Sequence, residues 1–135
     1  MRLVLDTNCL IQIVPSRSRY HEVWRMFERG EHKLCVSNEI LEEYTEILQR
    51  LTDEETAELV VSTLLNSSFV ELIQPYFKFN LITADPDDNK FVDCSIAAGA
   101  RYIVSNDRHY DILKQITYPK VEVLSLDEFM AMQKC

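Results

Sequence analysis

Short apolar runs alternate with helical patterns along this 135-residue chain. The runs that predict buried strands are 3–5, 33–36, 69–73, 101–104 and 121–124. Strands separated by helices usually form a parallel sheet that is covered by helices on both faces. The pattern therefore predicts one α/β domain over residues 1–135: a three-layer α/β/α sandwich with a central, mostly parallel four- or five-stranded sheet.

The helices are predicted from apolar spacing and from capping residues. They are expected over residues 21–29, 38–51, 52–66, 85–99, 107–115 and 125–132. Thr52 with Glu55, and Ser125 with Glu128, have the spacing of capping boxes. Asp85 precedes a proline at the first helical position, and Gly99 stands where a C-terminal cap belongs. Residues 75–84 follow no pattern that predicts a regular element.

Composition excludes some classes of protein. A net charge of −8 argues against a basic surface that coats nucleic acid. The four cysteines are scattered without a C-x-x-C pair, which favours free thiols in a reducing compartment over a disulfide framework or a zinc site. No apolar run approaches the roughly 20 residues of a membrane span, and no targeting leader is apparent. We therefore expect a cytoplasmic protein with no membrane partner.

Two of the expected strands end in acidic residues. Asp6 follows the first apolar run directly, and Asp107 follows Ser105 and Asn106 after the run at 101–104. The carboxyl ends of parallel strands meet at one edge of the sheet, where ligands of open α/β folds bind. The two carboxylates are therefore expected at the same edge.

The helix over 38–51 offers a third acid. At about 100° per residue, its apolar stripe centres near Tyr44 and Leu51, and Glu43 lies roughly 90° from that centre. Glu39, Glu42 and Glu46 lie farther round, on the solvent side. Glu43 is thus the acid at the rim of the buried face, although, taken alone, this position favours an ordinary boundary glutamate without a function.

A second acidic group surrounds the start of the helix that ends at Gly99. Asp85, Asp87 and Asp88 crowd its first turn, where acids favour the helix dipole. That ordinary explanation accounts for one or two of them better than for three. Asp93 points elsewhere on the same helix, as a supporting or an exposed residue.

Taken in order, these motifs resemble the PIN-domain family (named for the PilT N-terminus), and within it the VapC-like toxin ribonucleases. The matching pieces are Leu-Asp-Thr-Asn at 5–8, Val-Ser-x5-Glu at 36–43, an Asp that opens the helix before Gly-Ala at 99–100, and Ile-Val-Ser-x-Asp at 103–107. Their order and spacing span essentially the whole chain.

The resemblance implies a site of four acids. Asp6 matches the first, Glu43 the second and Asp107 the fourth. For the third, Asp88 has the family's spacing of eleven residues before Gly99, and Asp93 is the alternative alignment. The resemblance also implies supporting polar residues at Thr7, Asn8 and Ser105.

The activity implied is that of a metal-dependent endoribonuclease, the toxin of a toxin–antitoxin pair. Carboxylates suit Mg²⁺ or Mn²⁺, and such ions stabilise charge on the attacking and leaving oxygens during phosphodiester cleavage. The partners implied are an RNA substrate, an antitoxin protein and a second copy in a homodimer. The histidines His21, His32 and His109 show no ligand spacing and are expected at the surface or boundary. Scattered basic residues either guide RNA or only solvate the surface: Arg17, Arg19, Arg25 and Lys90.

Other classes fit the residues less well. A PIN-like scaffold that binds RNA or protein without turnover stays open, because intact acids do not prove catalysis. A phosphotransfer receiver would need a lysine after the last strand, where Ser125 and Leu126 follow and Lys120 precedes. A haloacid-dehalogenase-like phosphatase would need an aspartate two residues after Asp6, where Asn8 stands. Neither G-x-G-x-x-G nor a P-loop occurs.

Overall fold

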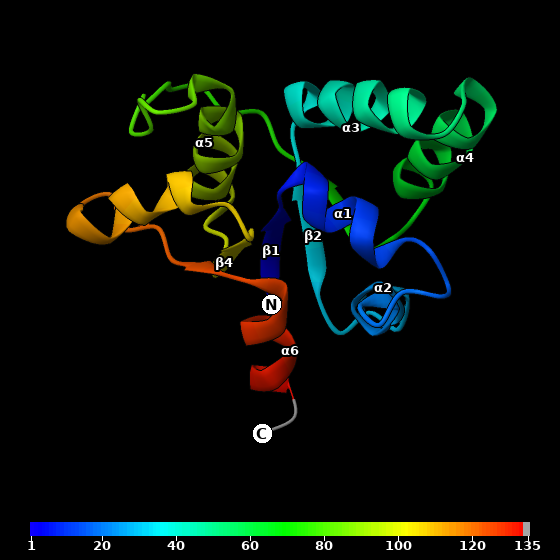
Figure 1. Ribbon diagram of the computed structural model, residues 1–135. Helices are drawn as coiled ribbons and strands as arrows, with labels where there is room; N and C mark the ends of the chain where they lie inside the picture. Colours follow the sequence, from blue (N-terminus) through cyan, green and yellow to red (C-terminus); the bar gives the residue numbers. More distant parts are fainter. Residues whose placement is uncertain (134–135) are drawn as a thin grey trace.

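In the computed structural model, which describes residues 1–133, five strands form one sheet (Figure 1). The strands are β1 (Arg2–Leu5), β2 (Lys33–Val36), β3 (Val70–Leu72), β4 (Tyr102–Val104) and β5 (Val123–Leu124). Their order is β3-β2-β1-β4-β5, and every neighbouring pair is parallel. The prediction of a mostly parallel sheet of four or five strands is confirmed.

Helices cover both faces of this sheet. The α-helices are α1 (Thr7–Ile13), α2 (His21–Glu28), α3 (Asn38–Leu51), α4 (Glu54–Leu65), α5 (Asn89–Ala98) and α6 (Leu126–Gln133), and the 3₁₀ helices are η1 (Pro86–Asp88) and η2 (Arg108–Gln115). In Figure 1, α5 lies on one side of the strands, and α1 and α2 lie on the other. The three-layer prediction is confirmed.

The central strand β1 is the point at which the strand order reverses. Leu3, Val4 and Leu5 are fully buried between β2 on one side and β4 on the other. In open α/β folds, the crevice beyond the carboxyl ends at such a point is where ligands bind. The residues that follow β1 and β4 therefore occupy the place where a ligand site is expected.

Of the two predicted capping boxes, the one at Ser125 is present and the one at Thr52 is not. The box of Ser125 and Glu128 is confirmed by reciprocal bonds: Ser125 N donates to Glu128 Oε1 at 2.9 Å, and Glu128 N donates to Ser125 Oγ at 3.1 Å. The predicted box at Thr52 is wrong, because Asp53 caps α4 by accepting from Thr56 N at 2.6 Å. Thr52 instead donates its hydroxyl proton to the carbonyl of Leu48.

Two further expectations are corrected. Leu51 was placed on the apolar stripe but is 62% exposed, because it is the last residue of α3 and extends past the buried part of the helix. The predicted helix that begins at Asp85 starts as the 3₁₀ turn η1, and the segment over 107–115 is the 3₁₀ helix η2. Gly99 caps α5 with a φ of +62°, a conformation that glycine adopts without strain.

Three of the cysteines are buried free thiols: Cys9, Cys35 and Cys94. Burial raises the pKa of Cys9 and of Cys94 to about 12, so both stay protonated and unreactive near neutral pH. The fourth, Cys135, lies outside the described residues. None of the helices formed by residues 1–133 combines the length and the apolar character that crossing a bilayer requires.

Candidate metal centre

Asp6 lies at the junction of β1 and α1, at the carboxyl end of the central strand. Its backbone N–H donates to the carbonyl oxygen of Val104 at 3.1 Å, which extends the pairing of β1 with β4 through this residue. Asp6 is 5% exposed, and its Oδ2 accepts a hydrogen bond from Ser105 Oγ at 2.8 Å. Burial raises the pKa of Asp6; the Ser105 hydroxyl opposes this shift, and the charges of Glu43 and Asp107 add to it.

Asp107 meets Asp6 through the same serine. The backbone N–H of Asp107 donates to Ser105 Oγ at 3.0 Å, while Asp107 Oδ1 accepts from the backbone N–H of His109 at 2.8 Å and so begins η2. Ser105 thus uses its hydroxyl proton on Asp6 and its lone pair on Asp107. The two strand-end acids lie at one edge of the sheet, as parallel strands require.

Asp85 and Asp88 enter from the turn that precedes α5. Asp85 caps η1 by accepting from the backbone N–H of Asp87 at 3.2 Å. Asp88 is 8% exposed, and within residues 1–133 its Oδ2 is buried without a hydrogen-bond partner. Burial raises the pKa of Asp88 to about 7, and the charges of Asp6, Asp85 and Asp107 contribute to the shift. A buried carboxylate oxygen without a partner is costly, and a cation would relieve that cost.

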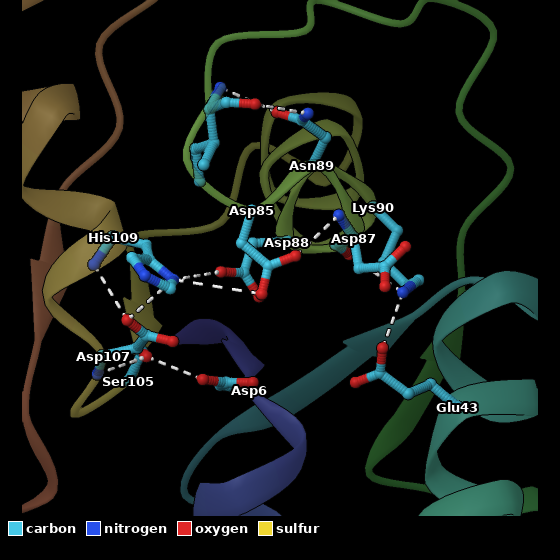
Figure 2. A network of polar contacts seen from close by, with 11 residues as sticks. Asp6, Glu43, Asp85, Asp87, Asp88, Asn89, Lys90, Ser105, Asp107 and His109 are labelled. Carbon is cyan, nitrogen blue, oxygen red and sulfur yellow. Dashed lines mark hydrogen bonds and ion pairs between the residues drawn. The ribbon is translucent and has the colours of Figure 1, made fainter.

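His109 reaches these acids, which the sequence analysis did not anticipate. Its Nδ1 lies 3.2 Å from Asp107 Oδ1, 3.5 Å from Asp88 Oδ2 and 3.9 Å from Asp85 Oδ2. Its side chain is 44% exposed, as expected for a surface or boundary residue, but its ring points into the acidic group (Figure 2). The available signal was its place two residues after Asp107, in the first turn of a helix that starts at the sheet edge.

Glu43 faces the site from α3 and is already paired. Its Oε2 accepts a hydrogen bond from the hydroxyl of Thr7, and its Oε1 lies 2.6 Å from Lys90 Nζ. Lys90 also donates to the carbonyl oxygen of Asp87 at 2.9 Å, and its side chain is only 15% exposed. The interpretation of Lys90 as one of several scattered surface charges is wrong, because it links α5 to the glutamate of α3.

Asp93, the alternative third acid, lies apart from this group. It is 8% exposed, so the expectation that it is simply exposed is wrong. One of its oxygens accepts a hydrogen bond from the backbone N–H of Phe79 at 3.1 Å. Burial raises the pKa of Asp93, and the Phe79 N–H opposes that shift. Asp93 therefore anchors the irregular segment 75–84 and does not face Asp6.

The supporting residues differ in what they contact. Ser105 and Thr7 each donate a hydroxyl proton to one of the acids, Asp6 and Glu43 respectively. Asn8 is exposed on α1 and borders a groove beside the strand-end acids. The groove is lined by Asp6, Asn8, Ile11, Gln12, Leu51, Asn106 and Asp107.

The donor set fits a divalent cation. Four aspartates from three parts of the chain gather here (Figure 2): Asp6, Asp85, Asp88 and Asp107. Carboxylates that share one site disfavour one another's ionisation, and a bound dication favours the ionised form of all of them. Asp85, Asp88 and His109 each offer one donor atom, and these three atoms lie within 4.8 Å of one another. The partnerless Asp88 oxygen belongs to this set, which supports a cation there.

Solved structures with the same fold are similar to this chain at low sequence identity. VapBC-1 of nontypeable Haemophilus influenzae matches at a TM-score of 0.66 and 12% identity, over 94% of this chain and 99% of the matched chain. VapBC2 of Rickettsia felis, solved with a promoter DNA fragment, matches at a TM-score of 0.64 and 17% identity, over 93% of this chain and 98% of the matched chain. VapC20 of Mycobacterium tuberculosis, described as a sarcin–ricin-loop-cleaving toxin, matches at a TM-score of 0.59 and 12% identity, over 81% of this chain and 92% of the matched chain. At these identities the likeness shows the fold alone.

A comparison with curated proteins returns no match. A protein-family model described as the PIN domain matches residues 2–109, which is well over half of the chain. The matched range contains both strand-end acids, Glu43, the turn before α5 and His109. The chain belongs to the PIN-domain family.

Proposed function

We propose that this protein is a metal-dependent endoribonuclease that hydrolyses single-stranded RNA. The observation that carries the proposal is the buried Oδ2 of Asp88, which accepts no hydrogen bond from the described residues and lies beside three further aspartates at the carboxyl edge of a parallel sheet. A nuclease fold supports it, because PIN domains are typically metal-dependent nucleases. One solved structure with this fold is described as a sarcin–ricin-loop-cleaving toxin.

The proposed ligands of Mg²⁺ or Mn²⁺ are drawn from the acids Asp6, Asp85, Asp88 and Asp107, with Glu43 as a further catalytic acid. A bound ion would supply positive charge at the phosphate oxygens and acidify the attacking water. Ser105 holds the carboxylate of Asp6 and the backbone of Asp107 in fixed positions.

Glu43 is positioned by its own pair of contacts. Thr7 donates to one of its carboxylate oxygens, and Lys90 holds the other. This arrangement keeps Glu43 facing the acids of the sheet edge across the gap between α3 and α5. It also leaves Glu43 with less free capacity for a cation than Asp88 has.

We also infer that the nuclease is the toxin of a toxin–antitoxin pair, that residues 1–135 form a single PIN-like domain, and that the protein acts as a cytoplasmic homodimer. The support is the likeness to chains of VapBC complexes. An antitoxin would be the protein partner and RNA the substrate. If so, expression alone should stop growth of a bacterial host. Co-expression of the neighbouring small open reading frame should restore that growth.

One observation favours an alternative, a PIN-like scaffold that binds RNA or protein without turnover. Lys90 already neutralises Glu43 with an ion pair of 2.6 Å, so this acid could be structural. A scaffold would keep its fold and its RNA binding when Asp6 is changed, and the wild type would show no cleavage with any metal.

The nuclease proposal is tested with an end-labelled single-stranded RNA and the purified full chain in Mn²⁺, in Mg²⁺ and in EDTA. We expect cleavage only with metal and a loss of about 100-fold or more in Asp6→Asn. Asp111→Asn changes an exposed acid of η2 that forms an ion pair with Lys114, and this matched control should keep full activity. Cleavage in EDTA, or equal cleavage by Asp6→Asn, would contradict the proposal.

A further inference from the structure

We propose that His109 is a direct metal ligand and that its imidazole makes this site selective for Mn²⁺ over Mg²⁺. The inference deepens the proposed metal-dependent function and rests on it for the presence of a bound dication. It concerns a residue outside the family's set of acids, and it names the chemical class of ion: a first-row transition-metal dication that accepts nitrogen as well as oxygen.

The first argument is the convergence of donors on one point. The Nδ1 atom of His109 lies between 3.2 and 3.9 Å from carboxylate oxygens of Asp85, Asp88 and Asp107. Two donors on opposite sides of one ion lie about 4–5 Å apart, twice a metal–ligand distance of about 2.0–2.5 Å. The separations within 4.8 Å among Asp85, Asp88 and His109 are therefore those of donors around a single ion.

The surroundings of Asp88 also favour a cation at this place. Asp88 Oδ2 is buried, and among residues 1–133 it has no hydrogen-bond partner. His109 Nδ1 is 3.5 Å away, which is within ion-pair range but beyond the usual hydrogen-bond range of about 2.7–3.2 Å. An ion between these two atoms would satisfy both. The side chain of His109 is 44% exposed, so the ion can arrive from solvent without opening the fold.

The third argument concerns which ion fits. Mg²⁺ prefers oxygen ligands and keeps several waters, whereas imidazole is a ligand of first-row transition metals. Carboxylates suit both Mg²⁺ and Mn²⁺, so a site of acids alone discriminates weakly between them. Mn²⁺ binds nitrogen less tightly than the later first-row ions do, but it tolerates nitrogen better than Mg²⁺, so adding one imidazole to Asp85 and Asp88 favours Mn²⁺ over Mg²⁺.

A purely structural role for His109 makes the opposite prediction. As a cation among Asp85, Asp88 and Asp107, His109 would compete with any dication for the same oxygens. Its removal would then raise the affinities for Mn²⁺ and for Mg²⁺ by similar factors. As a ligand, its removal lowers the affinity for Mn²⁺ and leaves that for Mg²⁺ nearly unchanged.

The test is calorimetric titration of the full chain with Mn²⁺ alone and with Mg²⁺ alone. The wild type should bind Mn²⁺ at least about tenfold more tightly than Mg²⁺. His109→Asn should weaken Mn²⁺ binding by about tenfold or more and change Mg²⁺ binding by less than about threefold. His21→Asn is the matched control, because His21 Nδ1 contacts the carbonyl oxygen of Ile13 away from the acids, and it should change neither affinity.

Pulsed electron paramagnetic resonance of bound Mn²⁺ provides a second readout. We expect coupling to a directly bonded ¹⁴N nucleus in the wild type and in His21→Asn, and its loss in His109→Asn. Absence of Mn²⁺ binding, absence of nitrogen coupling, or an equal change in both affinities would overturn the inference. Nitrogen-coupled Mn²⁺ without RNA cleavage would refute only the nuclease proposal, and RNA cleavage without nitrogen coupling would refute only the role of His109.

Discussion

Two aspartates of neighbouring elements, Asp88 at the end of η1 and Asp93 within α5, are equally buried but differently surrounded. Asp88 and Asp93 are each 8% exposed, and burial raises the pKa of both. Asp93 accepts the backbone N–H of Phe79, whereas Asp88 Oδ2 lacks a hydrogen-bond partner in the described chain. Only Asp88 also has the charges of Asp6, Asp85 and Asp107 near it.

The difference shows that burial of an acid does not by itself mark a functional residue. Asp93 has a structural role, because it is one of the side chains of α5 that hold the irregular segment 75–84 in place. Asn89, on the same helix, accepts from Ile82 N at 2.9 Å and donates to Ile82 O at 2.8 Å. Satisfied oxygens indicate structure, and an unsatisfied oxygen among like charges indicates a ligand.

The largest expected effect is a difference in RNA cleavage between variants of Asp88 and of Asp93. Asp88→Asn should lower Mn²⁺-dependent RNA cleavage by about 100-fold or more, because it removes a charge that the cation needs. Asp93→Asn should change cleavage by less than about fivefold, since the amide oxygen can still accept from Phe79. Both variants are measured as initial rates on the same RNA. An inactive Asp93→Asn beside a near-normal Asp88→Asn would reverse the assignment of the third acid.

An intermediate effect is expected in the stability of the metal-free protein as a function of pH. The pKa of Asp88 rises from 3.8 to about 7 on folding, so the folded protein holds a proton that the unfolded chain releases. The stabilisation from this proton is complete below about pH 4 and is lost as pH rises to about 7.

Asp88→Asn removes that dependence. Its gain in stability over the wild type should grow as pH rises from about 4 to about 7 and reach about 1–3 kcal/mol near pH 8. Urea unfolding in EDTA across this range is the measurement, with Asp111→Asn as the control. A difference that stays constant with pH would show that Asp88 is ionised in the folded protein throughout.

The smallest expected effect is on the proteolysis of residues 75–84, the segment that Asp93 holds. Asp93→Ala removes the acceptor for Phe79 N–H, so residues 75–84 should open more often. Cleavage by chymotrypsin after Tyr76 or Phe77, which are 82% and 74% exposed, should accelerate by about tenfold. Chymotrypsin should cleave Asp93→Asn nearly as slowly as the wild type. An equal acceleration in Asp88→Ala would mean that the segment depends on the whole turn and not on Asp93.

The strands and the long helix could be predicted because their signals are local. The predicted range 33–36 is that of β2, and 38–51 is that of α3. Apolar spacing decides both, and each element buries the residues its pattern selects, such as Ile40, Tyr44 and Leu48. The edge at which Asp6 and Asp107 meet follows from parallel pairing alone.

The pairings within the site could not be predicted, because they depend on distances between separate elements. Lys90 and Glu43 lie 47 residues apart, and nothing near either residue indicates that they pair. His109 and Asp88 come from different 3₁₀ helices. The segment 75–84 resisted prediction for a related reason: its backbone is held by the side chains of Asn89 and Asp93 and not by a repeating pattern.

The central position of β1 has a consequence for the order in which the molecule forms. β1 pairs with β4, a strand that is distant in sequence, and Asp6 meets Ser105 only when that pairing exists. Contacts between residues so distant in sequence form late and slowly during folding. Until β4 and Asp107 have been added to the growing chain, Asp107 cannot join Asp6, so the complete set of acids forms only after β1 and β4 have paired.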